Sequence, residues 1–461
     1  AAEALRLYTQ AANLLFRNPG LVTLEERDAL VRALDLYERL LGEVAGDPEE
    51  EHRFAYATLQ LADGLNNLGE HGPAARVCRR AVATLRRLSE AYPQREDYRF
   101  HHAEGCSQLG GTLVVVGGGD EAFGFRREAV RVGDELVARH PGRDDYRASL
   151  AAYQATLARE YAARGEPTAA ELLFVRSLEA NRELVARYPQ DPVRYQFLDV
   201  ASRTYAEFLL MRDRAGDRYW EFARERLELC DRARAQPNWA QIVPHLVHLD
   251  VACVLDRVGR RAEADRVMAH GLAVWGELAA RQPPVAGSKT MYAYWLDGDG
   301  HRRWATDPAG ARECFRQAIA VLEPLVSGPS GSGADLTFAE VHALCPDPSI
   351  RDPARALAHA QRVPAGFELR PQILGICFYE DGDDEAARSE LEAFLADGRL
   401  PAGDHRVVLA RVYLAMALGR LGERDRAEAE LRAARGEIRT NPNARWQTLA
   451  ALGRSEKLLA D

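Results

Sequence analysis

The chain has 461 residues, of which 47% are apolar, and its net charge of −9 is spread along its length. That length exceeds what one compact core needs, and the apolar fraction is ordinary for a folded protein. An acidic chain without a basic face is poorly suited to nucleic acid. No apolar run approaches the roughly 20 residues of a membrane-spanning helix, so we expect no membrane insertion by this chain itself.

The cysteines exclude two further classes of protein. Seven are present, an odd number, and no two of them form a C-x-x-C pair. A disulfide framework or a zinc knuckle would need paired spacings of that kind. We therefore expect buried free thiols, which behave as small apolar side chains.

The first predicted element is a helical leader over residues 1–46, which Asn18-Pro19-Gly20 interrupts. Over residues 47–326 the sequence then repeats itself with a period of about 48 residues. The repeat is marked by prolines at equal intervals, namely Pro93, Pro141, Pro189 and Pro237. Proline cannot continue a helix and biases its predecessor away from helical conformation. Each proline therefore marks a junction between units.

Each interval between these prolines predicts a hairpin of two helices. In the interval from Pro141 to Pro189, one apolar series at helical spacing runs from Leu150 to Tyr161, and a second runs from Leu173 to Leu184. Gly165-Glu166-Pro167 lies between them and breaks the helix. About six such long hairpins fit between residues 47 and 326.

A Gly/Ser/Pro linker is predicted at residues 327–334, because Ser327-Gly328-Pro329-Ser330-Gly331-Ser332-Gly333 has the composition of a flexible chain. Residues 335–461 then return to helical hairpins, which are shorter than those before the linker.

Small and bulky residues recur inside the hairpins in a fixed pattern. Ala170-x3-Phe174 and Ala311-x3-Phe315 place a small residue one turn before an aromatic one, and Leu374-Gly375-x2-Phe378 is a related pattern on a first helix. Small residues let two helices approach, and a bulky one fills the gap beside them. The pattern resembles the tetratricopeptide repeat (TPR). The resemblance implies an all-α fold of tandem antiparallel helical hairpins, stacked as a right-handed α-solenoid with a concave face.

Leu344–Ala356 resembles a segment that is common in TPR proteins from some large-genome bacteria. The leader around Pro19-Gly20-Leu21 and the tail from Leu414 to Trp446 resemble the C-terminal TPR region of bacterial transmembrane eukaryotic-type Ser/Thr protein kinases. The chain has no H-R-D, D-F-G or V-A-I-K motif, so this resemblance places the catalytic domain outside this chain. It implies a regulatory region that is either cytoplasmic or the extracytoplasmic part of a membrane-anchored protein.

Two glycine-rich stretches are similar to ligand-binding loops, yet a turn is predicted at each. Gly117-Gly118-Gly119 follows an apolar run, as in a dinucleotide-binding loop, but it occupies the slot that Gly165 fills one repeat later. Asp297-Gly298-Asp299-Gly300 begins like a calcium loop, but His301 and Arg302 stand where a ligand and a glycine are needed.

One pair of histidines has the spacing of metal ligands. His245 and His248 lie one turn apart on a predicted helix, and Asp250 is close by. A metal site needs converging ligands, and no third one is evident, so structural histidines are predicted. We expect no metal, no cofactor and no catalytic residue.

The leading hypothesis is a non-catalytic scaffold that binds a protein or peptide partner in a concave groove and binds no nucleic acid. By analogy with TPR proteins, the groove is lined by the first helix of successive hairpins. The candidates are Asn66, Asn67, Ser107, Gln154, Arg203 and Tyr205.

Two alternatives stay open beside this hypothesis. One is the sensory or regulatory C-terminal part of a membrane-bound Ser/Thr protein kinase. The other is an enzyme on a helical scaffold. The absence of an acid–base or nucleophile constellation in the sequence argues against it. The partner's identity, the face that binds it and the oligomeric state are left open by the sequence.

Overall fold

The structure, a computed structural model, describes ten stretches of the chain in two compact units. The division between the units falls after Phe208, and each unit is described by itself. The predicted leader, up to residue 45, and residues 328–332 of the predicted linker lie outside the described residues. The described stretches are 46–67, 70–213, 217–234, 247–281, 287–327, 333–364, 367–397, 400, 404–440 and 445–460.

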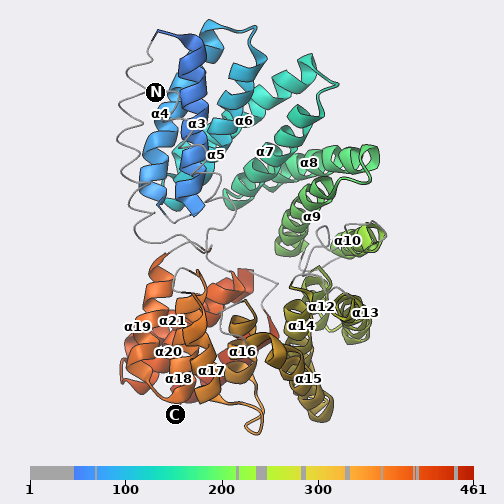
Figure 1. Ribbon diagram of the computed structural model, residues 1–461, viewed down its shortest axis with the longest axis vertical. Coiled ribbons are helices and arrows are strands. Elements are labelled where there is room, and N and C mark those ends of the chain that lie inside the picture. Colours follow the sequence, from blue (N-terminus) through green and yellow to red (C-terminus); the bar gives the residue numbers. More distant parts are fainter. Residues whose placement is uncertain are drawn as a thin grey trace. The chain divides into compact units, whose positions relative to one another are not determined.

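The first unit is built from antiparallel helix pairs of nearly equal length (Figure 1). Its hairpins are α3 (Pro48–Asn67) with α4 (His71–Ala91), α5 (Glu96–Val115) with α6 (Gly119–Arg139), and α7 (Asp144–Ala163) with α8 (Pro167–Arg187); α9 (Pro192–Asp213) follows, and most of it belongs to this unit.

The second unit continues the same plan with helices of more varied length (Figure 1). It contains α10 (Asp217–Arg234), the hairpins α12 (Val247–Arg257) with α13 (Arg261–Ala280), α14 (Ser288–Arg303) with α15 (Pro308–Val326), α16 (Gly333–Leu344) with α17 (Pro353–Arg362), α18 (Arg370–Asp381) with α19 (Asp384–Asp397), and α20 (His405–Arg420) with α21 (Arg424–Thr440), and finally α22 (Trp446–Ala460).

No strand occurs in the part of the chain that the structure describes. The predicted fold class, all-α with tandem antiparallel hairpins, is confirmed. None of the described helices is both long and apolar enough to cross a membrane.

Glycines in the left-handed conformation end the first helix of several hairpins. Gly117 and Gly165 have φ values of +83° and +77° and end the first helix of their hairpins at the same slot, 48 residues apart. Gly382, with φ of +95°, does the same after α18. A residue with a Cβ is strained in this conformation. The turn predicted at Gly117 is therefore confirmed.

The turn predicted at Asp297–Gly300 is wrong, because these residues lie inside α14 and are buried. A Cβ on Gly300 would lie 2.7 Å from the ring of Phe315 on α15, so glycine here serves close helix packing rather than a turn. The carboxylate of Asp299 is paired within its own helix, with Arg302 at 2.9 Å and with Arg303 at 2.6 Å.

The residues predicted to pack inside the hairpins do so. Ala170 and Phe174 are buried, and the Phe174 ring centroid lies 5.2 Å from that of Phe208 and 5.8 Å from that of Tyr205 on α9. Phe315 is buried as well. All seven cysteines are free, and all but Cys314 are buried.

The first helices of successive hairpins form one layer in each unit. In the first unit α3 contacts α5 and α5 contacts α7; in the second unit α14, α16, α18 and α20 contact one another in turn. Second helices of successive hairpins make no contact of comparable size among the described residues. The layer with the closer neighbours is the tighter side of a curved stack. We call the first helices the inner layer.

Candidate binding surfaces

The residues predicted to line a groove differ widely in exposure. Gln154 and Tyr205 are buried, at 2% and 7% exposed. Asn66 and Ser107 are half-buried and Arg203 is exposed, while the side chain of Asn67 lies outside the described residues. The buried pair has little surface for a ligand. A lining role for the six residues stays a prediction.

Two of these candidates make contacts that hold neighbouring helices together. Nδ2 of Asn66 donates a hydrogen bond of 2.8 Å to Oγ1 of Thr112, which joins α3 to α5. The ring of Tyr205 packs beside Phe174 and Phe208. Both side chains therefore have a structural role.

Aromatic rings stack between α3 and α5 on the inner layer of the first unit. The ring centroid of His101 lies 3.9 Å from that of Tyr56 and 4.9 Å from that of His52, with interplanar angles of 18° and 15°. Nε2 of His52 and Nδ1 of His101 are 2.8 Å apart, a hydrogen bond between two imidazoles. Burial lowers the pKa of His101 to about 4. The stacked rings are therefore neutral at physiological pH.

Glu104 on α5 lies near Tyr56 of this stack, and Asp63 on α3 lies near Glu104; both carboxyl groups are half-buried. Oε2 of Glu104 is buried and has no hydrogen-bond partner among the described residues. Burial raises the pKa of both carboxyls, and the charge of Asp63 raises that of Glu104 further. The charge of Glu104 in turn raises the pKa of Tyr56. We call Tyr56, Asp63, His101 and Glu104 the inner acidic patch.

The patch is suited to a positive charge that the described chain does not itself supply. A carboxylate held partly out of water is destabilised until an opposite charge approaches it. The faces of aromatic rings attract cations as well. An Arg or Lys side chain from another molecule would meet both kinds of group here.

In the second unit, α22 packs across the inner layer. Its contacts show which kinds of side chain that layer can bind. This helix packs mainly on α20, also contacts α14, and makes little contact with α21, which precedes it. Elsewhere in the unit a first helix contacts the second helix of the preceding hairpin extensively, as α20 does with α19. The C-terminal helix therefore departs from the register of the stack.

The start of α22 is held by carboxylates of α12. Nη2 of Arg445 lies 2.7 Å from Oδ1 of Asp250, and Nε1 of Trp446 donates a hydrogen bond of 3.1 Å to Oδ2 of Asp256. Arg445 is buried. Asp250 thus pairs with a residue 195 positions away.

The rest of α22 is held in the same way by α14 and α18. Nε2 of Gln447 donates a hydrogen bond of 2.9 Å to Oδ2 of Asp297 on α14. Nη1 of Arg454 lies 2.7 Å from Oε1 of Glu380 on α18. The inner layer of the second unit therefore holds a helix by offering carboxylates to its cationic and N–H groups.

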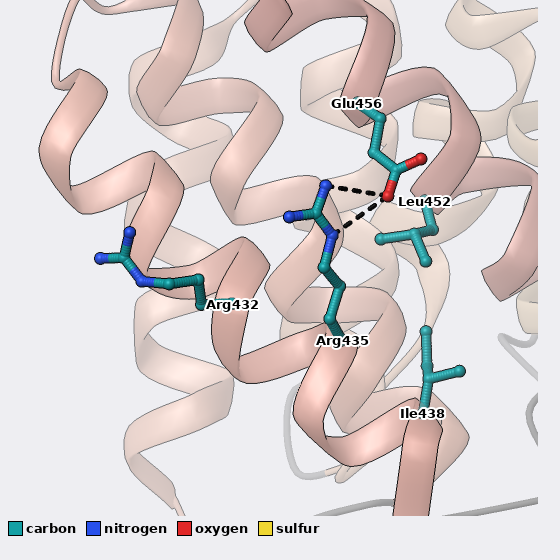
Figure 2. A pocket seen from close by; sticks show the side chains of 5 residues that line it. All are labelled: Arg432, Arg435, Ile438, Leu452 and Glu456. Carbon is teal, nitrogen blue, oxygen red and sulfur yellow. Dashed lines mark hydrogen bonds and ion pairs between the residues drawn. The ribbon is translucent and has the colours of Figure 1, made fainter.

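A cleft of about 480 Å³ opens between α21 and α22. Figure 2 shows Ile438 and Leu452 on its apolar side and Arg432, Arg435 and Glu456 around it. The guanidinium of Arg435 donates to Oε1 of Glu456 from Nε at 3.1 Å and from Nη2 at 2.9 Å. The lining has neither a nucleophile nor an imidazole, so the cleft is suited to contact rather than to acid–base chemistry.

The acidic patch was missed by sequence reasoning, although a signal for it exists. Glu104 lies 48 residues after Tyr56, so the two occupy the same slot on successive first helices. A charged side chain in a slot that faces inward is a better marker of a binding surface than a neutral amide. Asp63 has no such marker, since its slot holds Gly111 one repeat later.

The sequence matches no family model, and no curated protein sequence is significantly similar to it. Solved structures of low sequence identity match most of the chain. The human IFIT1 dimer with PPP-AAAA shares 15% identity over 96% of this chain and 97% of that chain, with a TM-score of 0.35. A chain of the APC/C hetero-tetramer Cut9-Hcn1 shares 13% over 98% and 96%, with a TM-score of 0.30. Yeast Tom70 shares 10% over 89% and 96%, with a TM-score of 0.27. At TM-scores this low, the fold class rests on the chain's own helices and their contacts.

Proposed function

We propose that the chain is a non-catalytic, TPR-like scaffold that binds a protein or peptide partner on the inner layer of its first unit. The observation that carries the proposal is the inner acidic patch, where Asp63 and Glu104 have no cationic partner among the described residues. The partner is a helix or an extended segment that presents Arg or Lys to these carboxyls. No nucleic acid, cofactor or catalytic step is part of the proposal.

The second unit supports this choice of partner. There, the inner layer binds α22 through carboxylates that accept from Arg445, Gln447 and Arg454. In the first unit, Asp63 and Glu104 lie on the inner helices and have no cationic partner among the described residues. A partner helix with cationic side chains would make in the first unit the kind of contact that α22 makes in the second.

The test is selection of peptides from a random 12-residue display library on the immobilised full chain. We expect enrichment of peptides with Arg or Lys beside an apolar or aromatic residue. A selected peptide is then made synthetically, and its binding is measured by fluorescence anisotropy. Removing both carboxyls, in Asp63→Asn with Glu104→Gln, should weaken binding at least about tenfold, since a hydrogen bond to a charged group contributes about 1.5–3 kcal/mol.

The matched control removes the same charge from the outer layer. Glu166 and Glu179 are exposed residues at the start of α8 and within it, and Glu166→Gln with Glu179→Gln should leave the affinity unchanged. Equal weakening in both double variants would show only a general effect of charge. Enrichment of acidic peptides, or binding that survives loss of Asp63 and Glu104, would contradict the proposal.

We propose as a second candidate that this scaffold is the regulatory region of a membrane-bound Ser/Thr protein kinase. The resemblance of the leader around Pro19-Gly20-Leu21 and of the tail from Leu414 to Trp446 to such regions favours it. The complete gene decides the matter: it should encode a kinase domain with its motifs and a membrane helix upstream of Ala1. A complete gene without them would exclude this candidate and leave the scaffold proposal standing.

A further inference from the structure

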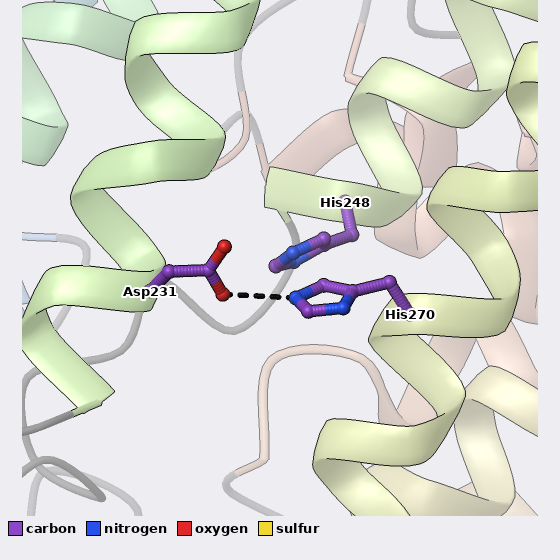
Figure 3. Close-up of side chains that lie close together, drawn as sticks. All are labelled: Asp231, His248 and His270. Atoms are coloured by element: carbon purple, nitrogen blue, oxygen red, sulfur yellow. Dashed lines mark hydrogen bonds and ion pairs between the residues drawn. The ribbon is translucent and has the colours of Figure 1, made fainter.

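Three side chains from three helices of the second unit converge in the manner of metal ligands. Asp231 belongs to α10, His248 to α12 and His270 to α13. One ligating atom from each lies within 4.8 Å of the other two, and no other such group of three occurs in the part of the chain that the structure describes. Figure 3 shows the two imidazole rings and the carboxylate facing one another.

Helix packing sets the positions of the two histidines. His248 is buried, and its ring centroid lies 6.2 Å from that of Trp295. Gly271 follows His270, and a Cβ at that position would overlap the ring of Trp295 and lie 3.1 Å from Cβ of His248. Glycine therefore lets α13 come close to α12, and it brings the ring centroid of His270 to 5.1 Å from that of His248.

The third ligand comes from α10. Nε2 of His270 lies 2.9 Å from Oδ1 of Asp231, and both side chains are about half exposed, at 43% and 51%. These two side chains can rotate, whereas the buried His248 is held by its surroundings. The site therefore has one fixed ligand and two adjustable ones.

We propose that Asp231, His248 and His270 bind a divalent transition-metal ion of the zinc class. Ligand atoms around a tetrahedral zinc ion at about 2.0–2.1 Å lie roughly 3.3 Å from one another. The present spacing brackets that value, so small side-chain rotations complete the site. Two imidazoles and one carboxylate suit zinc and its neighbours, whereas calcium and magnesium prefer oxygen ligands alone. Water or a donor from another molecule takes the fourth position.

The ion would join α10 to the hairpin of α12 and α13. Direct contact between α10 and α12 is small among the described residues. A ligand that binds only the folded arrangement stabilises it by mass action. Zinc should therefore raise the melting temperature of the second unit. This inference is independent of the peptide surface proposed in the first unit.

The test is titration of the full, metal-free chain with Zn²⁺ by isothermal calorimetry, and with Co²⁺ by visible absorption. We expect one saturable site, with the visible bands of Co²⁺ bound to nitrogen and oxygen. Asp231→Asn and His270→Gln should each weaken binding at least about tenfold, since even the outer partners of metal ligands contribute 10–100-fold. The rise in melting temperature with Zn²⁺ should be lost in both variants.

The matched control is His140→Gln. Nε2 of His140 lies 3.0 Å from Oε1 of Glu96, so this is also a histidine–carboxylate pair, but it has no third ligating side chain among the described residues. Its loss should leave the calorimetric titration unchanged. Because Asp231 and His270 are half exposed, their variants should keep the helical circular dichroism of the parent. The absence of a saturable site in the parent, or parent-like affinity in Asp231→Asn and His270→Gln, would overturn the proposal.

Discussion

Glu340 shows how the inner layer changes the chemistry of a single residue. It lies half-buried on α16, and burial raises the pKa of its carboxyl to about 8, with the charge of Asp297 adding to the rise and Arg406 opposing it. In the unfolded chain the same group ionises near its ordinary pKa of about 4.3. Folding therefore keeps a proton on Glu340 at pH values where the unfolded chain loses it.

The difference in the pKa of Glu340 between the folded and the unfolded chain predicts how the free energy of unfolding changes with pH. Between about pH 5 and pH 8 the folded chain binds more protons at Glu340 than the unfolded chain does, so raising the pH lowers the free energy of unfolding. Glu340→Gln cannot ionise, so its stability relative to the parent should rise over that interval by more than about 1 kcal/mol. Urea unfolding at several pH values measures this. Parallel pH profiles would contradict the prediction, and Glu179→Gln on α8 is the exposed control.

At the scale of the element, buried and half-buried polar contacts add to the apolar packing that holds α22 on the second unit. The side chains of Arg445 and Asp250 are only 5% and 14% exposed. Removing one partner of such a pair leaves a charge that is neither solvated nor neutralised. That loss is larger than the net stabilisation the pair provides.

Arg445→Ala should therefore destabilise the second unit by about 3–5 kcal/mol, because Asp250 stays behind without its cation. Chemical denaturation, with hydrogen exchange in α12 and α22, measures the effect. Arg432→Ala, whose side chain is 66% exposed, should stay within about 0.5 kcal/mol of the parent. Unchanged exchange in α22 of Arg445→Ala would show that this helix is held by other contacts.

For the molecule as a whole, the division into two compact units determines how far damage spreads. A stacked repeat contacts only its neighbours, so the loss of one core residue acts locally. The repeat that contains Ala170 and Phe174 lies in the first unit.

Phe174→Ala should destabilise the first unit by about 3–5 kcal/mol, because the ring is buried between helices and leaves a cavity. Amide exchange should become faster in α7, α8 and α9 and stay unchanged from α16 onward. Leu172→Ala on the same helix is the control, since that side chain is 62% exposed and should change little. Faster exchange throughout both units after Phe174→Ala would show that they unfold together.

The sequence by itself determined the helical hairpins, most of their turns and the packing of Phe174. These features are local: a 3.6-residue apolar period specifies a helix, and a glycine that needs positive φ, such as Gly165, specifies its end. The same local logic failed at Gly300, because a glycine also permits close packing, and only the position of Phe315 shows which role it has.

Only the tertiary structure decided which surfaces carry function. Asp250 lies close to His248 in the sequence, yet it pairs with Arg445, while His248 lies near Asp231 and His270 from two other helices. Whether side chains so far apart in the chain come into contact depends on how closely successive helices approach one another and on where α22 packs. The period of the sequence repeat specifies that helices stack. It does not specify which side chains of different repeats come within bonding distance.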